Sequence, residues 1–435
     1  MKFVFALFIY FTFYGAVFSQ NYTSYHTGNT TDIDTTGQGG VCLMGGASED
    51  DNAMVWFLER ANQGDVLVLR ASGSDGYNNY MYTSLGVTVN SVETIVFNDA
   101  TAANESYIHQ AIQEAEAIWF AGGDQWDYIS YWRNTAIDSL INEVLHTKNT
   151  VIGGTSAGMA IQGRYYFSAE NGTVTSATAL SNPYDNTVTV DSAAFLKNNY
   201  LSDVITDTHY ENPDRKGRHV TFLAQIITDD GIVGKGIACD EYTAVCIDDS
   251  GMAKVYGQYP TYDDNAYFIQ PNCELSATEM LPENCTTGNS LNWNRNQDAL
   301  RVYRIQGTTG AANSFDLKDW TTASGGEWQS WWVDAGVLYE DNASPINCSL
   351  SLIEDEWSMI SIFPNPASDF IEIAGMRYGD RVIGISDLQG KRVSDMDDFS
   401  PGENRIDIQT LESGIYILSL QSAIGSIKQV KFTKW

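Results

Sequence analysis

The stretch "NTVIGGTSAGMAIQG" (residues 149–163) decides how the fold can be read, because it joins an apolar run to a turn of small residues. Gly154, Ser156 and Gly158 fit the pattern G-x-S-x-G, with a strand-like run before them and a helix-compatible segment after them. In that pattern the glycines permit a strained turn that lifts the serine hydroxyl above a sheet, and the next backbone N–H can face an oxyanion. The sequence therefore predicts Ser156 as a candidate nucleophile, and a tight structural turn is the alternative.

Short apolar runs alternate with helical patterns on both sides of this turn. The strand-like runs are "VCLM" (41–44), "DVLVLR" (65–70), "ETIVFN" (93–98), "AIWF" (117–120) and "NTVIGG" (149–154). Helical spacing fills the intervals, most regularly at Ile137, Leu140, Ile141, Val144 and Leu145. Such alternation is typical of an α/β fold with a mostly parallel sheet and helices on both faces. We expect a ligand to bind beyond the carboxyl ends of the strands.

A nucleophilic serine needs a base and an acid that orients it. The histidines of the chain are His26, His109, His146, His209 and His219. His209 follows the apolar "DVIT" at a strand-to-loop exit, whereas the other histidines lie in a polar leader or on helical patterns. From the residues alone, the orienting acid can be Asp207, Asp240 or Glu241. The order Ser, His, acid differs from the Ser, Asp/Glu, His order of α/β-hydrolases and argues against an esterase or lipase.

The composition is acidic, with a formal net charge of −31 over 435 residues. A polyanion of this kind makes nucleic acid and acidic membrane surfaces poor partners. No CxxC or clustered Cys/His spacing suggests zinc, so neither a metal nor another cofactor is expected. The sequence leaves the oligomeric state open, a homodimer included.

The first 20 residues, "MKFVFALFIYFTFYGAVFSQ", have the pattern of a signal peptide: Lys2, an apolar stretch and a small residue, Ser19, near a cleavage point. The alternative is a retained membrane anchor, but polar residues follow without a basic stop-transfer flank. The sequence predicts export.

The cysteines lead to two expectations. In an exported chain the six cysteines can form disulfides, and Cys273 with Cys285 is our first choice because they bracket a loop-like segment. Cys42 lies inside an apolar run and is expected to be a buried thiol.

The second half of the chain changes character. Residues 251–350 show short β-like runs, and the aromatic "EWQSWWVDAGVLY" (327–339) raises the possibilities of carbohydrate stacking or strand packing, of which we favour strand packing. After an acidic linker at 351–360, residues 361–435 alternate short strands with turn signals, which predicts a small β-sandwich. This region holds no histidine or cysteine, so no chemistry is expected there.

Several motifs together resemble the cyanophycinase and peptidase E family of serine peptidases. They are "VCLMGGASED", "AIWFAGGDQ", "GGTSAGMAI", "DTHYENPDRKGRH" and "GIACDEYTA", in this order between residues 41 and 244. The resemblance implies a class I glutamine amidotransferase-like fold for a peptidase domain at 21–350, with its core at 41–250 and a β-rich extension at 251–350. It implies a secreted serine exopeptidase for aspartyl or β-aspartyl linkages, cyanophycin and its β-Asp-Arg dipeptides included.

The same resemblance assigns roles to individual residues. Ser156 is implied as the nucleophile, His209 as the general base and Glu241 as its orienting acid. Backbone N–H groups near Gly123 and Ala157 are implied as the oxyanion site. The substrate-binding residues implied are Gln125, Asp207, Arg215 and Arg218, and the two arginines suit a substrate carboxylate because a guanidinium can bind it with two parallel hydrogen bonds.

Two positions depart from the family pattern. Thr208 stands where a glutamine is usual, and Pro213 falls where an additional arginine is usual. Because these positions help to hold the β-aspartyl-arginine unit, the departures predict a broadened or redirected specificity. The rival interpretation is a surface binding protein that kept the fold without turnover, and an intact Ser156, His209 and Glu241 argues against it.

The C-terminal region resembles a different family. "FPNPASDFIEI" (363–373), "DLQGKRV" (387–393) and "GIYILSL" (414–420) resemble the sorting domain of cargo for the type IX secretion system. The resemblance implies contact with that machinery, passage through an outer membrane, and an extracellular or cell-surface location.

Overall fold

The computed structural model describes residues 21–191, 195–348, 360–374, 381–389, 391–394, 405–421 and 427–435. The expected signal peptide (1–20) and nearly all of the expected linker (351–360) lie outside the described residues.

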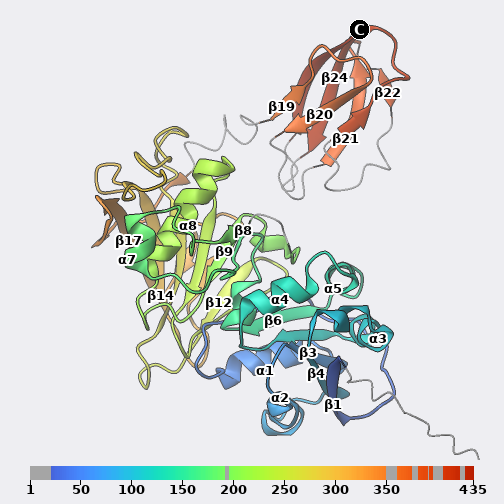
Figure 1. Ribbon diagram of the computed structural model, residues 1–435, viewed down its shortest axis with the longest axis vertical. Helices are drawn as coiled ribbons and strands as arrows, with labels where there is room; N and C mark the ends of the chain where they lie inside the picture. The colour runs from blue at the N-terminus through green and yellow to red at the C-terminus, as the bar shows by residue number, and fades with distance from the viewer. Residues whose placement is uncertain are drawn as a thin grey trace, which may run out of the picture.

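A ten-stranded mixed sheet forms the first part of the fold (Figure 1). Five adjacent strands in its middle are parallel, as the sequence predicted, and antiparallel strands flank them. Across the sheet the strands are β1 (Tyr22–Gly28), β4 (Ser91–Phe97), β3 (Asp65–Arg70), β5 (Ala117–Phe120), β6 (Val151–Thr155), β2 (Val41–Met44), β11 (Ala244–Ile247), β12 (Met252–Tyr256), β15 (Ser314–Asp316) and β16 (Ala323–Ser324).

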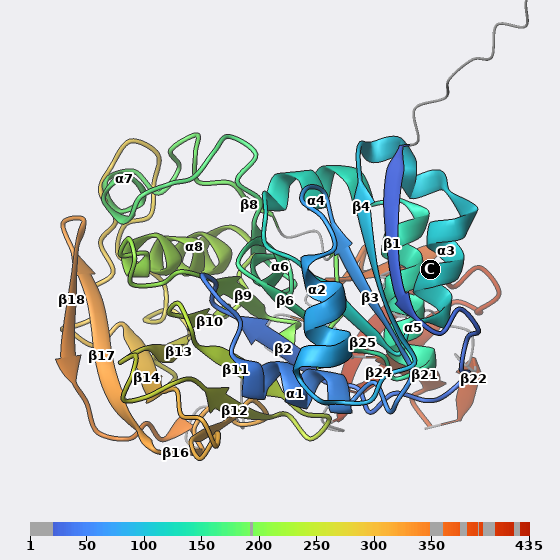
Figure 2. The same cartoon turned by 90° about the horizontal axis from the view of Figure 1, so that it is seen from below.

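Helices cover both faces of this sheet. One face packs on α3 (Ser106–Glu114), α4 (Gln125–Trp132) and α5 (Ala136–Thr147), and the other on α1 (Asp51–Glu59) and the short α2 (Gly76–Asn79), which η1 (Tyr80–Ser84) continues. Figure 2 shows α1 and α2 on one side and α3 and α5 on the other. The division follows the period of two along each strand: Leu67 and Leu69 of β3 face one cluster, and Val66 and Val68 face the other. The expected fold class is confirmed.

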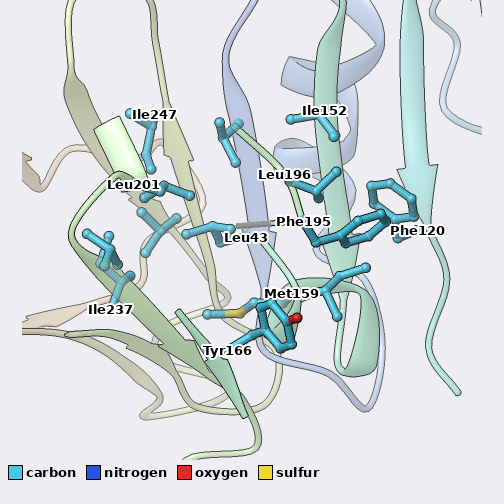
Figure 3. Packing of buried hydrophobic residues seen from close by; sticks show 14 of the residues in the cluster. Leu43, Phe120, Ile152, Met159, Tyr166, Phe195, Leu196, Leu201, Ile237 and Ile247 are labelled. Carbon is cyan, nitrogen blue, oxygen red and sulfur yellow. The ribbon is translucent and has the colours of Figure 1, made fainter. Parts of the chain in front are cut away.

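The core continues from the first sheet into a second, six-stranded sheet. Figure 3 shows Leu43 of the first sheet between Ile237 on one side and Ile152, Phe120 and Met159 on the other, and all five residues belong to one buried cluster. The second sheet has the order β18 (Val337–Asn342), β17 (Gly326–Asp334), β14 (Leu300–Gln306), β13 (Asn265–Pro271), β10 (Lys235–Cys239) and β9 (Val204–Asp207). Only β9 and β10 are parallel within it.

The buried helix α8 (Lys216–Asp229) packs against β9, β10 and α7 (Ser176–Ser181). In the aromatic run, Trp328 and Trp331 are buried in β17, and Trp332 stacks on Tyr339 of β18 with ring centroids 5.6 Å apart. Strand packing therefore accounts for this run.

The C-terminal residues form two small sheets that share an apolar core. One sheet has the order β19 (Ser361–Phe363), β20 (Phe370–Ala374), β23 (Arg405–Asp407), and the other β22 (Arg392–Ser394), β21 (Arg381–Asp387), β24 (Gly414–Gln421), β25 (Ile427–Lys434). Ile371 and Ile406 of the first sheet pack with Val382 and Leu418 of the second. The expected small β-sandwich is confirmed.

The expected disulfide is wrong. Cys273 is bonded to Cys348, while Cys285 is a free, buried thiol. Cys273 packs at the edge of the cluster that contains Cys348, whereas Cys285 belongs to a different cluster, so the two chosen sulfurs do not meet. Cys42 is a buried free thiol, as expected. Among the described residues, no helix has the length and apolar character needed to cross a bilayer, and no group of side chains suits a metal ion.

Candidate active site

Ser156 occupies the turn between β6 and the short helix α6 (Ala157–Ala160) with φ 52° and ψ −116°. A positive φ is costly for a residue with a Cβ atom and is retained where the surroundings enforce it. The two flanking glycines make the turn possible. A Cβ atom on Gly154 would lie 2.5 Å from the backbone of Gly158, and one on Gly158 would lie 2.1 Å from the carbonyl oxygen of Phe120.

A continuous hydrogen-bonded triad extends from the serine. The distance between Ser156 Oγ and His209 Nε2 is 2.7 Å, and that between His209 Nδ1 and Glu241 Oε1 is 2.6 Å. A carboxylate only accepts hydrogen bonds, so Nδ1 carries the proton and Nε2 accepts from the hydroxyl. The His209 and Glu241 side chains are 22% and 21% exposed, which leaves the triad open to a substrate.

His209 lies beyond the carboxyl end of β9, where the loop after β2 holds it. Its φ is 47°, and its backbone N–H donates to the Gly45 carbonyl at 2.9 Å. A Cβ atom on Gly46 (φ 120°) would lie 2.4 Å from the imidazole ring. Gly46 is therefore a functional residue that the sequence reasoning missed, although its motif "VCLMGG" was part of the resemblance.

The structure distinguishes the three candidate acids. Glu241 contacts His209, whereas Asp207 pairs with Arg218, and Asp240 accepts from the Asn265 backbone N–H at 2.9 Å. Asp240 is fully buried. Its burial, and then the nearby charge of Glu211, raise its pKa to about 7 despite the hydrogen bond from Asn265.

Two backbone segments border Ser156 where an oxyanion would form. Ala157 is the first residue of α6, so its N–H has no acceptor within its own helix. Gly122 lies on the other side: a Cβ atom on it would be 3.6 Å from the Ser156 Cβ. Tyr128 donates to the carbonyls of Ala121 and Gly122 at 2.9 and 3.1 Å, and this fixes the turn that carries Gly123.

Asp207 and Arg218 form a buried ion pair. Arg218 Nε and Nη2 donate to the two Asp207 oxygens at 2.9 and 2.5 Å, and both side chains are 3% exposed. Arg218 Nη1 also donates to Thr173 Oγ1 at 3.2 Å. Burial alone would raise the pKa of Asp207, but the charge and hydrogen bonds of Arg218 outweigh it and lower the pKa. The Arg218 guanidinium is therefore bound to Asp207 and is buried inside the protein.

Arg215 differs from Arg218 in exposure and partners. It is half-buried just before α8, and its Nη1 donates to the Thr208 carbonyl at 3.0 Å. Burial, followed by repulsion from Arg218, lowers its pKa, while Asp207 and Glu241 oppose the shift. Arg215 is more exposed than Arg218, and the charge of Glu241 acts on it.

The other candidate residues contact backbone carbonyl groups rather than the triad. Gln125, at the start of α4, donates to the Phe167 carbonyl at 3.4 Å. His219 is buried on α8, where burial lowers its pKa to about 4, and its Nε2 lies 3.3 Å from the Ile205 carbonyl. His26 and His109 contact the carbonyls of Asn29 and Ala103. None of these three histidines is hydrogen-bonded to Ser156 in the described part of the chain.

Two further acids, Glu211 and Asp264, lie near Glu241. Burial, a hydrogen bond with Glu211 and the charges of Glu211 and Glu241 raise the pKa of Asp264 to about 7. Sequence reasoning missed this pair because the two residues are distant in sequence: Glu211 lies inside the motif "DTHYENPDRKGRH", whereas Asp264 belongs to no motif.

A strained serine on a strand–turn–helix elbow, bonded to a histidine and then to a carboxylate, defines the class of α/β proteins with serine-hydrolase geometry. Residues 49–255 match the model of Peptidase family S51, and residues 361–433 match that of the Secretion system C-terminal sorting domain. The chain is therefore similar to peptidase family S51 over residues 49–255 and to secretion sorting domains over residues 361–433.

Similar proteins include cyanophycinases. The chain is 24% identical over 167 residues to the cyanophycinase of Trichormus variabilis, a match that covers 38% of this chain and 51% of the relative. It is 24% identical over 232 residues to that of Thermosynechococcus vestitus, covering 51% and 67%. The chain spans about half the length of the first of these relatives.

Two solved structures are also similar. A peptidase from an acI-B1 Actinobacterium has a TM-score of 0.37 and 15% identity, covering 52% of this chain and 89% of its own. A putative peptidase E protein from Listeria monocytogenes EGD-e has a TM-score of 0.32 and 18% identity, covering 51% and 98%.

Proposed function

We propose that this protein is an exported serine exopeptidase that hydrolyses aspartyl or β-aspartyl peptide bonds. The single observation that carries the proposal is the triad, in which Ser156 Oγ, the His209 ring and Glu241 Oε1 are joined by hydrogen bonds of 2.7 and 2.6 Å. The match of residues 49–255 to Peptidase family S51 supports it.

In the proposed reaction, Ser156 Oγ attacks the scissile carbonyl carbon while His209 Nε2 takes its proton. Glu241 holds the ring in the reactive tautomer and stabilises the imidazolium that forms. The N–H groups of Ala157 and Gly123 stabilise the oxyanion. The imidazolium then protonates the leaving amine, and a water molecule, activated by the same ring, hydrolyses the acyl-enzyme.

Substrate acidity is the second part of the proposal. We assign the substrate carboxylate to Arg215, which is half-buried, donates to the Thr208 carbonyl and interacts electrostatically with Glu241. Arg218 cannot meet that carboxylate without leaving Asp207 buried and unpaired, which is costly. In place of the direct contact expected from the sequence, Arg218 and Asp207 therefore act as positioning residues for the loop that carries His209. Gln125 remains our second proposed substrate-binding residue.

Specificity is expected to differ from that of the cyanophycinases that the chain resembles. Thr208 engages Arg215 through its carbonyl and, at 3.4 Å, through its hydroxyl, and Pro213 offers no cationic side chain. The protein therefore has fewer groups to hold a β-aspartyl-arginine unit, and short aspartyl peptides become as good candidates as cyanophycin.

The C-terminal sorting domain indicates export. We propose that residues 361–433 engage type IX secretion machinery and that the peptidase acts outside the cell or at its surface.

The experiment is a side-by-side assay of amine release from α-aspartyl dipeptides, β-aspartyl dipeptides, cyanophycin and matched neutral dipeptides, with asparagine replacing α-linked aspartate and isoasparagine replacing β-linked aspartate. The proposal predicts turnover of at least one acidic substrate and a kcat/KM at least tenfold lower for the neutral controls, because Arg215 would lose an ion pair. Equal turnover of acidic and neutral substrates would overturn the aspartyl specificity. No turnover of any peptide would favour the binding-protein interpretation.

A further inference from the structure

Two thiols face each other in the middle of the first sheet, in strands that border the candidate active site. Cys42 of β2 and Cys246 of β11 are cross-strand partners, and their Sγ atoms are 3.6 Å apart. They are 0% and 1% exposed. The proposed reaction uses neither residue.

The strand register favours a covalent bond between them. The Gly45 N–H donates to the Thr243 carbonyl at 2.9 Å, which makes these two residues a hydrogen-bonded antiparallel pair. Hydrogen-bonded and non-hydrogen-bonded pairs alternate along two antiparallel strands. Cys42 and Cys246 are the third pair after Gly45 and Thr243, so they form a non-hydrogen-bonded pair. The Cα atoms of such pairs lie about 4.5 Å apart, within the range that a disulfide can span. Rotation of the side chains alone would bring the sulfurs together.

The compartment favours oxidation as well. The chain carries a secretion sorting domain and already holds one disulfide, Cys273–Cys348. Disulfides form and persist in exported proteins, whereas cytosolic thiols stay reduced.

We propose that Cys42 and Cys246 form a disulfide in the exported protein and covalently link β2 to β11. The oxidant is a thiol–disulfide donor of the export compartment, either a small-molecule disulfide or a protein disulfide. The Cys42 thiolate attacks one sulfur of the donor, forming a mixed disulfide and releasing the donor's first thiolate. The Cys246 thiolate then attacks the Cys42 sulfur and releases the second. Two protein thiols lose two protons and two electrons, and the donor is reduced to two thiols.

The bond forms fastest before β11 docks on β2. Burial raises the pKa of the Cys246 thiol in the folded protein, and the thiolate is the attacking species, so the folded pair reacts slowly. In the folding chain both sulfurs are accessible. After docking, the same burial protects the bond from reductants.

The link would connect the two segments that hold His209 in place. β2 leads directly into Gly45 and Gly46, which contact His209, and β11 begins three residues after Glu241. The cross-link closes a sequence separation of 204 residues, against 75 for Cys273–Cys348. Because longer loops lose more entropy on closure, reduction should destabilise the peptidase region.

The test uses the wild-type protein secreted by a host that exports it. The protein is denatured and alkylated without a reductant, then digested and analysed by mass spectrometry. We expect a cross-linked peptide pair that contains Cys42 and Cys246, with alkylation confined to Cys239 and Cys285. Alkylation of Cys42 and Cys246 at the same stoichiometry as Cys239 would overturn the proposal.

Two variants sharpen the result. Cys246→Ala should release Cys42 for alkylation, so that three cysteines react. The matched control Cys285→Ala removes a buried thiol outside the pair and should retain the cross-linked peptide. A Cys42 that stays unreactive in Cys246→Ala would show that another partner holds it and would contradict the assignment.

Discussion

The ten-stranded sheet contributes Ser156 through one short turn, whereas the six-stranded sheet contributes His209 and Glu241 from the ends of two paired parallel strands. The part of the site that holds Ser156, here called the nucleophile side, is formed by residues close together in the sequence. Five consecutive residues supply the strain, the small side chains and the start of the helix. The base side is distributed, because β9, β10 and the loop after β2 must all be in place. A site of this kind depends on how the two sheets are joined.

Specific contacts join the two sides. Thr206 Oγ1 of β9 donates to the Met159 carbonyl of α6 at 2.7 Å, and the His209 N–H donates to Gly45. These bonds set the distance between nucleophile and base without touching either reactive atom. Variants of the two sides should therefore reduce activity in different ways. A variant on the nucleophile side loses the attacking group, whereas a variant on the base side loses the alignment of His209.

The largest effect is expected from Ser156→Ala, which removes only the attacking oxygen. We predict a fall in kcat of about 10⁶-fold, comparable to nucleophile removal in other serine triads, with the fold retained. Amine release from acidic peptides measures the rate, and circular dichroism checks the fold. Residual activity within tenfold of wild type would contradict the assignment.

The next largest effect is expected from Glu241→Gln. The amide cannot hold the His209 tautomer, and kcat should fall by about 10⁴-fold. The matched control is Asp240→Asn, one residue earlier, which keeps an oxygen for the Asn265 N–H and should change kcat little. Equal losses in the two variants would indicate a general disturbance of the β10 turn.

Gly46→Ala tests alignment alone. The added methyl would displace the His209 ring, and a misplacement of about 1 Å can cost about 100-fold in rate. Gly86→Ala is the control, because Gly86 also has a positive φ but no atom within 4 Å of the added methyl. If both variants lose activity alike, backbone strain rather than contact with His209 is responsible.

The two arginines should separate binding from positioning. Arg215→Ala should lower kcat/KM on acidic substrates by about 10- to 100-fold and leave stability nearly unchanged, since a charged hydrogen bond contributes about 1.5–3 kcal/mol. Arg218→Ala should instead destabilise the fold by about 3–5 kcal/mol, because Asp207 remains buried and unpaired. Denaturant unfolding and steady-state kinetics on both variants measure the two effects, and the reverse pattern would exchange the roles.

The last prediction concerns the pH dependence of stability rather than the rate. The pKa of Asp264 is raised from 3.8 to about 7, so the folded state binds this proton more tightly than the unfolded state does. Its contribution makes the free energy of unfolding decrease as pH rises from about 4 to 7. In Asp264→Asn this decrease should be shallower, and a residual slope from Asp240 should remain. Urea unfolding at several pH values measures it, and an unchanged slope would refute the contribution.

Much of the nucleophile side could be predicted from the sequence because its signals are local. The strands β3 and β5 coincide with the apolar runs "DVLVLR" and "AIWF". The helix after Ser156 is shorter than its composition suggests. It ends at Ala160, and three residues later the chain packs so closely on β9 that a Cβ atom on Gly163 would lie 2.3 Å from the Val204 carbonyl.

The misses involve contacts between distant residues. The residues of β1 are polar and lie at a sheet edge, so their sequence predicts only a polar leader, yet β1 pairs with β4 throughout. Three other contacts also leave no periodic signal in the sequence: the Arg218–Asp207 pair, the Cys273–Cys348 bond and the contact of Gly46 with His209. Charge and residue type indicated which groups belong to the site, and only the fold shows which of them meet.

The measurement that tests the central claim most directly is the rate and position of labelling by a fluorophosphonate, which reacts only with an activated serine. The account predicts a single modified peptide that contains Ser156, no labelling in Ser156→Ala, and labelling slowed by at least about 100-fold in Glu241→Gln, because base and acid activate the hydroxyl together. Labelling of another residue, or an equal rate in Glu241→Gln and wild type, would contradict the claim that Ser156, His209 and Glu241 act as one catalytic unit.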